Sequence, residues 1–185
     1  MTAPPTVLLD NRRQARKVRA VFWASLLAAA LALWGGWAIF ESYGTAAADG
    51  GVLKPLWQRL LFGGFVAALG LAAAGGMALY ISLYALRIEV RGDTVAIATM
   101  TPLGRRQREF ARSLFGESAY HHGRMHHMTS AGGRGGLWVN APWITLRVAG
   151  RSLPFVVDLQ ADEIDAGRLA VLAKGGVRDW QRDAG

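Results

Sequence analysis

The residues best suited to chemistry lie in one short run, residues 120–128, which contains all four histidines of the chain and two of its five methionines. Imidazole nitrogens bind copper, zinc, iron or nickel, and thioethers favour Cu(I). The run has no carboxylate, carries Arg124 in its middle and leads into the glycine-rich residues 129–136. It therefore has three interpretations: a solvated or partner-contacting loop, a copper site, or a pH sensor, since clustered histidines titrate near neutrality. We expect no other cofactor. The candidate ligands are His121, His122, His126, His127, Met125 and Met128.

Residues typical of catalysis are not grouped elsewhere. The chain has no cysteine, and it contains neither a nucleophile elbow nor a Walker sequence. Its carboxylates gather at Asp162, Glu163 and Asp165, where they suit the first turn of a helix. A single Gly-Arg-Gly element without interleaved aromatic residues is a poor signal for RNA. We predict a protein that is not an enzyme and does not bind nucleic acid.

Two long apolar runs dominate the first half of the chain. Residues 20–40 and residues 60–86 contain no charged side chain, and each is long enough for a helix that crosses a bilayer, which needs about 20 residues. A cleaved signal peptide would have a shorter apolar region than the first run. The pattern predicts a transmembrane hairpin over residues 20–86.

Small residues recur every four positions in both runs. A spacing of four keeps side chains near one helix face, and small residues let two backbones approach closely in lipid. Chance is the alternative, because alanine-rich sequences produce such rows. The predicted helix-packing residues are Ala24, Ala28, Ala32, Gly36, Gly64, Ala68, Ala72 and Gly76.

Basic residues set the orientation. They flank the hairpin in residues 1–19, which we interpret as a basic cytoplasmic segment, and after the second run at Arg87 and Arg91. The positive-inside rule then places both termini in the cytoplasm of a bacterial inner membrane. The formal net charge of +8 fits contact with anionic lipid or an acidic partner. The residues expected to make that contact are Arg12, Arg13, Arg16, Lys17, Arg19, Arg105, Arg106, Arg108 and Arg112.

The second half, residues 87–185, changes to an alternating pattern. Residues 87–91, 94–99, 105–111, 143–148 and 153–157 are typical of short strands separated by turns, as in an antiparallel meander. An apolar face of Ile164, Leu169, Val171 and Leu172 predicts a final helix from about residue 162. The predicted fold class is membrane α+β: a transmembrane hairpin followed by a cytoplasmic β-domain with a C-terminal helix, in a pleckstrin-homology-like layout.

Three segments resemble a known family: Val21-Phe22-Trp23-Ala24-Ser25, Thr99-Met100-Thr101-Pro102-Leu103-Gly104, and residues 147–158, which read RVAGRSLPFVVD. In order and spacing they resemble the two-span mitochondrial inner-membrane proteins involved in cytochrome c oxidase biogenesis, over roughly residues 16–158. Residues 1–10 lack the basic residues of a transit peptide, which favours a bacterial relative. The histidine- and glycine-rich residues 120–136 depart from the family pattern.

The resemblance implies a role in building or stabilising a membrane energy-converting complex. We predict a non-catalytic accessory subunit or assembly factor, with a respiratory oxidase as the first host and a bacterial photosynthetic complex as the second. Its partners would be subunits of that larger complex and anionic membrane lipids. A copper-handling membrane protein and an adaptor for anionic lipid surfaces are the alternatives from other classes.

Overall fold

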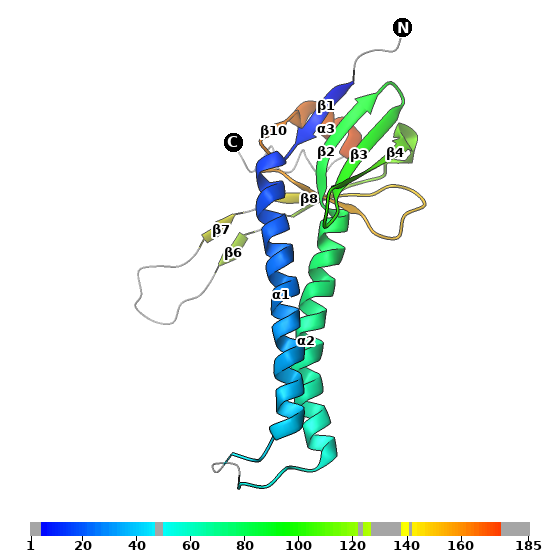
Figure 1. Ribbon diagram of the computed structural model, residues 1–185. Helices are drawn as coiled ribbons and strands as arrows, with labels where there is room; N and C mark the ends of the chain where they lie inside the picture. Colours follow the sequence, from blue (N-terminus) through cyan, green and yellow to red (C-terminus); the bar gives the residue numbers. More distant parts are fainter. Residues whose placement is uncertain (1–4, 47–49, 122–123, 127–137, 141, 175–185) are drawn as a thin grey trace. The chain divides into compact units, whose positions relative to one another are not determined.

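The computed structural model describes residues 5–46, 50–121, 124–126, 138–140 and 142–174 (Figure 1). The chain divides into two compact units. One consists of residues 17–81, and the other combines the segments before and after them. The helical residues are therefore an insertion, in chain order, within the unit that holds the β-strands.

Two long helices make up the inserted unit. Helix α1 spans Arg12–Ser42 and helix α2 spans Leu56–Leu83. Both are long and apolar enough to cross a membrane, as the uncharged runs predicted. The predicted end of the second helix at residue 86 is wrong. Ala85 and Leu86 are buried in the first strand after the helix, and an apolar run alone does not distinguish a helix from a buried strand.

The larger sheet has five antiparallel strands in the order β10-β1-β2-β3-β4. Three of them follow the hairpin at the predicted positions: β2 (Ala85–Arg91), β3 (Thr94–Met100) and β4 (Arg105–Ala111). A short strand, β10 (Glu163–Ile164), forms one edge. These elements confirm the predicted antiparallel arrangement.

Strand β1 (Thr6–Asp10) corrects the prediction for the N-terminal segment. Residues 1–19 were assigned to a separate basic segment, but β1 lies inside the larger sheet, between β10 and β2. A register shift between Val7 and Leu9 lets both Leu8 and Leu9 be buried. The β-domain therefore begins before the hairpin and continues after it.

A second sheet has the order β5-β8-β9, with β5 at Ala119–His121, β8 at Trp143–Leu146 and β9 at Phe155–Asp158. Strands β6 (Arg124–His126) and β7 (Trp138–Asn140) pair with each other, and a 3-10 turn, η2, spans Arg112–Leu114. The predicted strand over residues 153–157 begins two residues later, and that over 143–148 ends at Leu146. One apolar core joins both sheets and the final helix; among its members are Ile88, Ile97, Phe115, Ile144, Phe155 and Leu169.

Helix α3 spans Ala166–Ala173, so the predicted start near residue 162 is wrong. The side chain of Asp165 caps it by accepting a hydrogen bond from the Arg168 backbone N–H at 3.0 Å. Its buried face contains Leu169, Leu172 and Ala173, whereas Val171 is 63% exposed and Ile164 belongs to β10. The apolar face is therefore narrower than the sequence indicated.

Candidate functional site

The contact between α1 and α2 is built around glycine. A Cβ atom on Gly36 would lie 2.5 Å from the backbone oxygen of Gly63, and the reverse distance is also 2.5 Å. Gly70 fits against Ala29 and Ala32 in the same way. The absence of side chains at these positions lets the two backbones touch, which is how helices associate without a hydrophobic driving force in lipid.

The buried residues of the hairpin recur at intervals of seven, with one interval of four between Gly70 and Ala74, which differs from the predicted packing rows. They are Phe22, Ala29 and Gly36 in α1, and Gly63, Gly70, Ala74 and Ile81 in α2. Steps of seven stay almost in line on a helix, whereas each step of four advances by about 40°. A row spaced by four therefore turns away from its partner helix.

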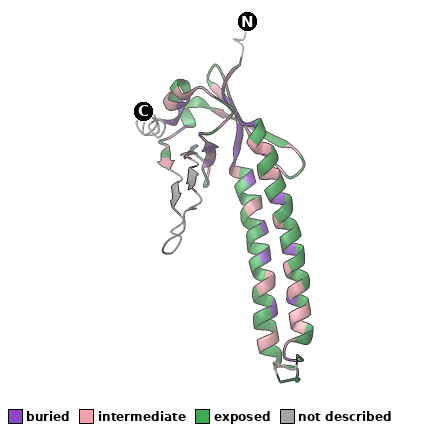
Figure 2. Ribbon diagram, turned by 90° about the vertical axis from the view of Figure 1, so that its left-hand side faces the viewer, coloured by how far each residue is buried: buried purple, intermediate pink, exposed green. Residues whose placement is uncertain are grey.

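The predicted packing residues accordingly lie mostly outside this contact. Gly36 is at its centre and Ala32 borders it. The others are exposed, and nothing lies within 4 Å of a Cβ placed on Gly64 or Gly76. These exposed members are Ala24, Ala28, Gly64, Ala68, Ala72 and Gly76. Most of the surface of both long helices is exposed (Figure 2).

The outer surface of the hairpin is apolar and rich in aromatic residues. Trp34 is 72% exposed, Trp57 63% and Phe65 60%. Arg59, a charged residue near the start of α2, is held by the hairpin itself: its Nε donates to the Phe40 carbonyl oxygen at 2.5 Å and its guanidinium lies 4.6 Å from the Phe40 ring. The surface suits lipid or other apolar helices far better than water.

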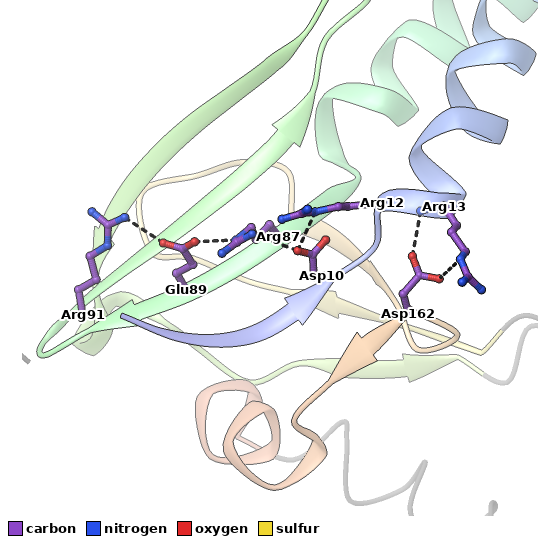
Figure 3. Close-up of polar contacts among 7 residues, drawn as sticks. All are labelled: Asp10, Arg12, Arg13, Arg87, Glu89, Arg91 and Asp162. Atoms are coloured by element: carbon purple, nitrogen blue, oxygen red, sulfur yellow. Dashed lines mark hydrogen bonds and ion pairs between the residues drawn. The ribbon is translucent and has the colours of Figure 1, made fainter. Parts of the chain in front are cut away.

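In the β-domain, a chain of ion pairs joins β1 to β2 (Figure 3). Arg87 Nη1 lies 3.1 Å from Asp10 Oδ2, and Arg87 Nε lies 2.6 Å from Glu89 Oε1. Glu89 Oε2 in turn pairs with Arg91 at 2.9 Å. Arg87, Glu89 and Arg91 alternate along β2 and so share one face of the strand. We name Asp10, Arg87, Glu89 and Arg91 the charge ladder.

The charge ladder lowers the pKa of Glu89. Burial opposes ionisation of this carboxyl group, but the guanidinium groups of Arg91 and Arg87 outweigh it and hold the pKa of Glu89 below its ordinary value of 4.5. Glu89 is therefore ionised at neutral pH and accepts hydrogen bonds from both arginines. Its carboxylate is fully engaged in fastening the strand, which suits a structural role better than proton transfer.

The N-terminus of α1 is capped by a residue far away in sequence. The helix has no acidic residue in its first turn. Instead the backbone N–H of Arg13 donates to Oδ2 of Asp162 over 2.9 Å, while Arg13 Nε lies 3.7 Å from Oδ1 of the same residue (Figure 3). A carboxylate there satisfies a free N–H and complements the helix dipole. Asp162 therefore caps α1, and not α3 as its position in the sequence suggested.

A buried hydrogen-bonded group sits at the junction of β1, α1 and β2. Asn11, which is fully buried, donates through Nδ2 to the Tyr84 hydroxyl at 2.7 Å, and that hydroxyl donates to Asp158 at 3.1 Å. The Asn11 backbone N–H also donates to the Leu86 carbonyl at 2.9 Å. These contacts tie the last residue before α1 to the first residues after α2.

The predicted basic cluster on β4 does not form one patch. Arg105 pairs with Met100 at one end of the strand, whereas Arg112 donates its backbone N–H to Asp93 at the other. Seven residues of extended chain separate them by about 23 Å. The pKa of Arg151 is lowered, mainly by burial and to a lesser degree by the positive charge of Arg108. Arg151 and Arg147 line a depression of about 390 Å³.

The histidine and methionine cluster lies largely outside the described residues. This applies to His122, His127 and Met128 and to the side chains of Met125 and His126. The His121 ring stacks on Trp143, with the ring centroids 3.9 Å apart. Within the described part of the chain, no group of three or more histidine, cysteine or acidic residues is arranged to hold a metal ion.

Several structurally important polar residues are not singled out by the sequence: Asp10, Asn11, Glu89 and Asp158. The alternation of Arg87, Glu89 and Arg91 was a usable signal, because opposite charges two apart on a strand lie side by side. A second usable signal was Asn11, because asparagine is favoured directly before the first residue of a helix. The partners of Asn11 and Arg13 come from distant segments and left no local signal.

The described residues define a protein with two helices long and apolar enough to cross a membrane and an antiparallel β-domain that ends in a short helix. No protein-family model matches the chain, and no curated protein or solved structure shows significant similarity to it.

Proposed function

We propose that this protein is a non-catalytic accessory subunit or assembly factor of a membrane energy-converting complex, anchored by α1 and α2 as a transmembrane hairpin. The observation that carries the proposal is the surface of the hairpin. Its internal contact uses a narrow line of small residues, so most of its large apolar side chains face outward. Such a surface is suited to lipid on some sides and to helices of a larger complex on others.

The pairing of β1 with β2 supports a hairpin that crosses twice. Val7 pairs with Glu89 and Asp10 with Arg87, so both ends of the inserted segment belong to one sheet. They must lie on the same side of any membrane that the helices span. The basic residues in the first two turns of α1 and those directly after α2 favour the cytoplasmic side of a bacterial inner membrane. The β-domain, with antiparallel sheets and the final helix α3, is compatible with a pleckstrin-homology-like layout.

The exposed row of small residues on α2 is the proposed contact with a partner helix. Gly64, Ala68, Ala72 and Gly76 are left open by α1, and small residues spaced by four favour close helix association. A respiratory oxidase is the first candidate host, because the sequence resembles proteins of oxidase biogenesis. A photosynthetic complex is the second.

The test is affinity purification in mild detergent, read by mass spectrometry and by an absorption spectrum. Co-purification of oxidase or photosynthetic subunits with haem or pigment bands supports the proposal; a fixed ratio indicates a subunit and substoichiometric recovery an assembly factor. The double substitution Gly64→Leu with Gly76→Leu is expected to abolish recovery of the partner. Gly75→Leu, which also meets nothing within 4 Å, is the matched control. A colourless preparation without partners contradicts the proposal.

A further inference from the structure

The tip of the β3–β4 hairpin lies at the end of the sheet where the chain leaves α2. Strand β2 begins at Ala85, directly after the last helical residues, and Ala85 pairs with Thr99. Strand β3 continues past this pair to Met100, which pairs with Arg105. The tip, residues 101–104, therefore extends roughly three residues, about 10 Å, beyond Ala85 toward the side from which the chain arrives.

This tip presents an apolar side chain and then two cations. Leu103 is 89% exposed, the most exposed of the large apolar residues in the described structure. Two hydrogen bonds close the turn: Thr101 N–H donates to the Gly104 carbonyl at 3.1 Å, and Gly104 N–H donates to Thr101 Oγ1 at 3.0 Å. Arg105 and Arg106 follow at once and are exposed. A closed turn with a leucine at its apex and arginines at its base matches the polarity gradient of a bilayer interface.

A second loop approaches the same end of the sheet. Tyr84 forms a parallel bridge with Val156, so the residues before Phe155 leave that bridge in the direction of Leu83. They include Leu153, which is 43% exposed, and Arg151. An exposed leucine with an arginine close to it in sequence thus occurs in both loops.

In the proposed transmembrane hairpin, the chain enters the β-domain close to the membrane, because β2 begins two residues after α2 ends. From Leu60, the first residue after Arg59, the helix runs to Leu83 and spans about 36 Å, whereas the hydrocarbon core is about 30 Å thick. Leu83 then lies several Å outside the core, among the headgroups. The tip lies about 10 Å from Ala85 within the β-domain, so the boundary of the acyl chains is within its reach.

We propose that the β3–β4 tip is a membrane-docking loop: Leu103 inserts into the acyl-chain boundary while Arg105 and Arg106 bind the phosphates of anionic lipids, with Leu153 and Arg151 alongside. The inference rests on the proposed transmembrane hairpin. It assigns the lipid-binding role to one end of β4 and excludes Arg112, which lies at the other end. The docked loop holds the β-domain in a fixed orientation on the leaflet.

The experiment uses single labels on the full chain in vesicles of phosphatidylcholine and phosphatidylglycerol. The chain has no cysteine, so Leu103→Cys can carry one environment-sensitive fluorophore. Asp93→Cys, in the turn at the opposite end of β3, is the aqueous control, and Leu69→Cys, in the middle of α2, is the control for insertion of the hairpin. Quenching by lipids with a nitroxide on the acyl chain reports depth, and quenching by iodide reports exposure to water.

The proposal expects lipid quenching at residues 103 and 69 and iodide quenching at residue 93. Each basic residue at an anionic surface shifts such an equilibrium about fivefold, so Arg105→Glu with Arg106→Glu should reduce docking more than tenfold. Arg112→Glu, the same type of substitution beyond the far end of β4, should leave docking unchanged. Quenching at 69 without quenching at 103 overturns the docking loop while leaving the hairpin intact. Absence of lipid quenching at 69 contradicts the transmembrane hairpin itself, and the docking loop with it.

Discussion

Two neighbouring glycines of α2 give a direct test of how closely the helices pack. Gly63→Ala would place a methyl group 2.5 Å from the backbone oxygen of Gly36, so the helices must separate. Gly64→Ala meets nothing within 4 Å. Both substitutions carry the same gain in helix propensity, about 1 kcal/mol in favour of alanine. The difference between them therefore isolates the contact with α1.

The expected magnitude follows from the cost of overpacking. Forcing an extra methyl group into a close-packed contact costs about 1–3 kcal/mol. Gly63→Ala is therefore expected to destabilise the helical hairpin, relative to Gly64→Ala, by that amount. This corresponds to a change of about 5- to 150-fold in the equilibrium between packed and separated helices.

The equilibrium can be followed by energy transfer across the open end of the hairpin. Donor and acceptor dyes on Val21→Cys and Leu79→Cys occupy exposed positions at the ends of α1 and α2 that no loop joins. In dodecylmaltoside micelles titrated with dodecyl sulfate, Gly63→Ala should lose energy transfer at a lower denaturant fraction than the parent. Gly64→Ala should match or exceed the parent. Equal shifts for the two variants would refute the glycine contact.

Two further predictions concern the β-domain. Asp162→Ala removes the cap from α1 at a cost of about 1 kcal/mol, so the Arg13 amide should exchange hydrogen about fivefold faster. Asp165→Ala removes the cap of α3 and should leave exchange of the Arg13 amide unchanged. Equal effects of the two substitutions would contradict the assignment of Asp162 to α1. The folded pKa of Glu89 is lowered, so its ion pairs stabilise the domain above pH 4.5, and this contribution is lost as the pH falls through the folded value. Thermal unfolding should therefore show a smaller drop in Tm on acidification for Glu89→Gln than for the parent, and identical drops would exclude this linkage.

The helices and strands could be predicted where neighbouring residues formed a strong pattern. Residues 20–40 and 60–86 lack charge over a length that water-soluble helices rarely sustain, and α1 and α2 contain most of these two runs. The alternation in residues 87–111 similarly gave β2, β3 and β4. These signals need only the chemistry of neighbouring residues.

The features that the sequence did not predict depend on contacts with residues distant in the chain. Strand β1 is five residues long and its bulge buries two successive leucines, so it has neither alternation nor length to reveal it. The rows of small residues pointed to packing, but only the opposing helix decides that Gly63 and not Gly64 lies in the contact. Asp162 was assigned to the nearer helix because its real partner, Arg13, is distant in the chain.

The insertion of the hairpin between β1 and β2 sets the order of events during synthesis. Residues 11–84 separate the two strands. At ribosomal rates of 5–20 residues per second, β2 is therefore synthesised roughly 4 to 15 seconds after β1. Leu8 and Leu9 have no sheet to cover them during that interval. Closure of the sheet must follow synthesis of both apolar helices. In the proposed transmembrane arrangement, a second helix that fails to cross the bilayer would leave β2 on the opposite side from β1, and the sheet could not form. Folding of the β-domain would then depend on correct insertion of the hairpin.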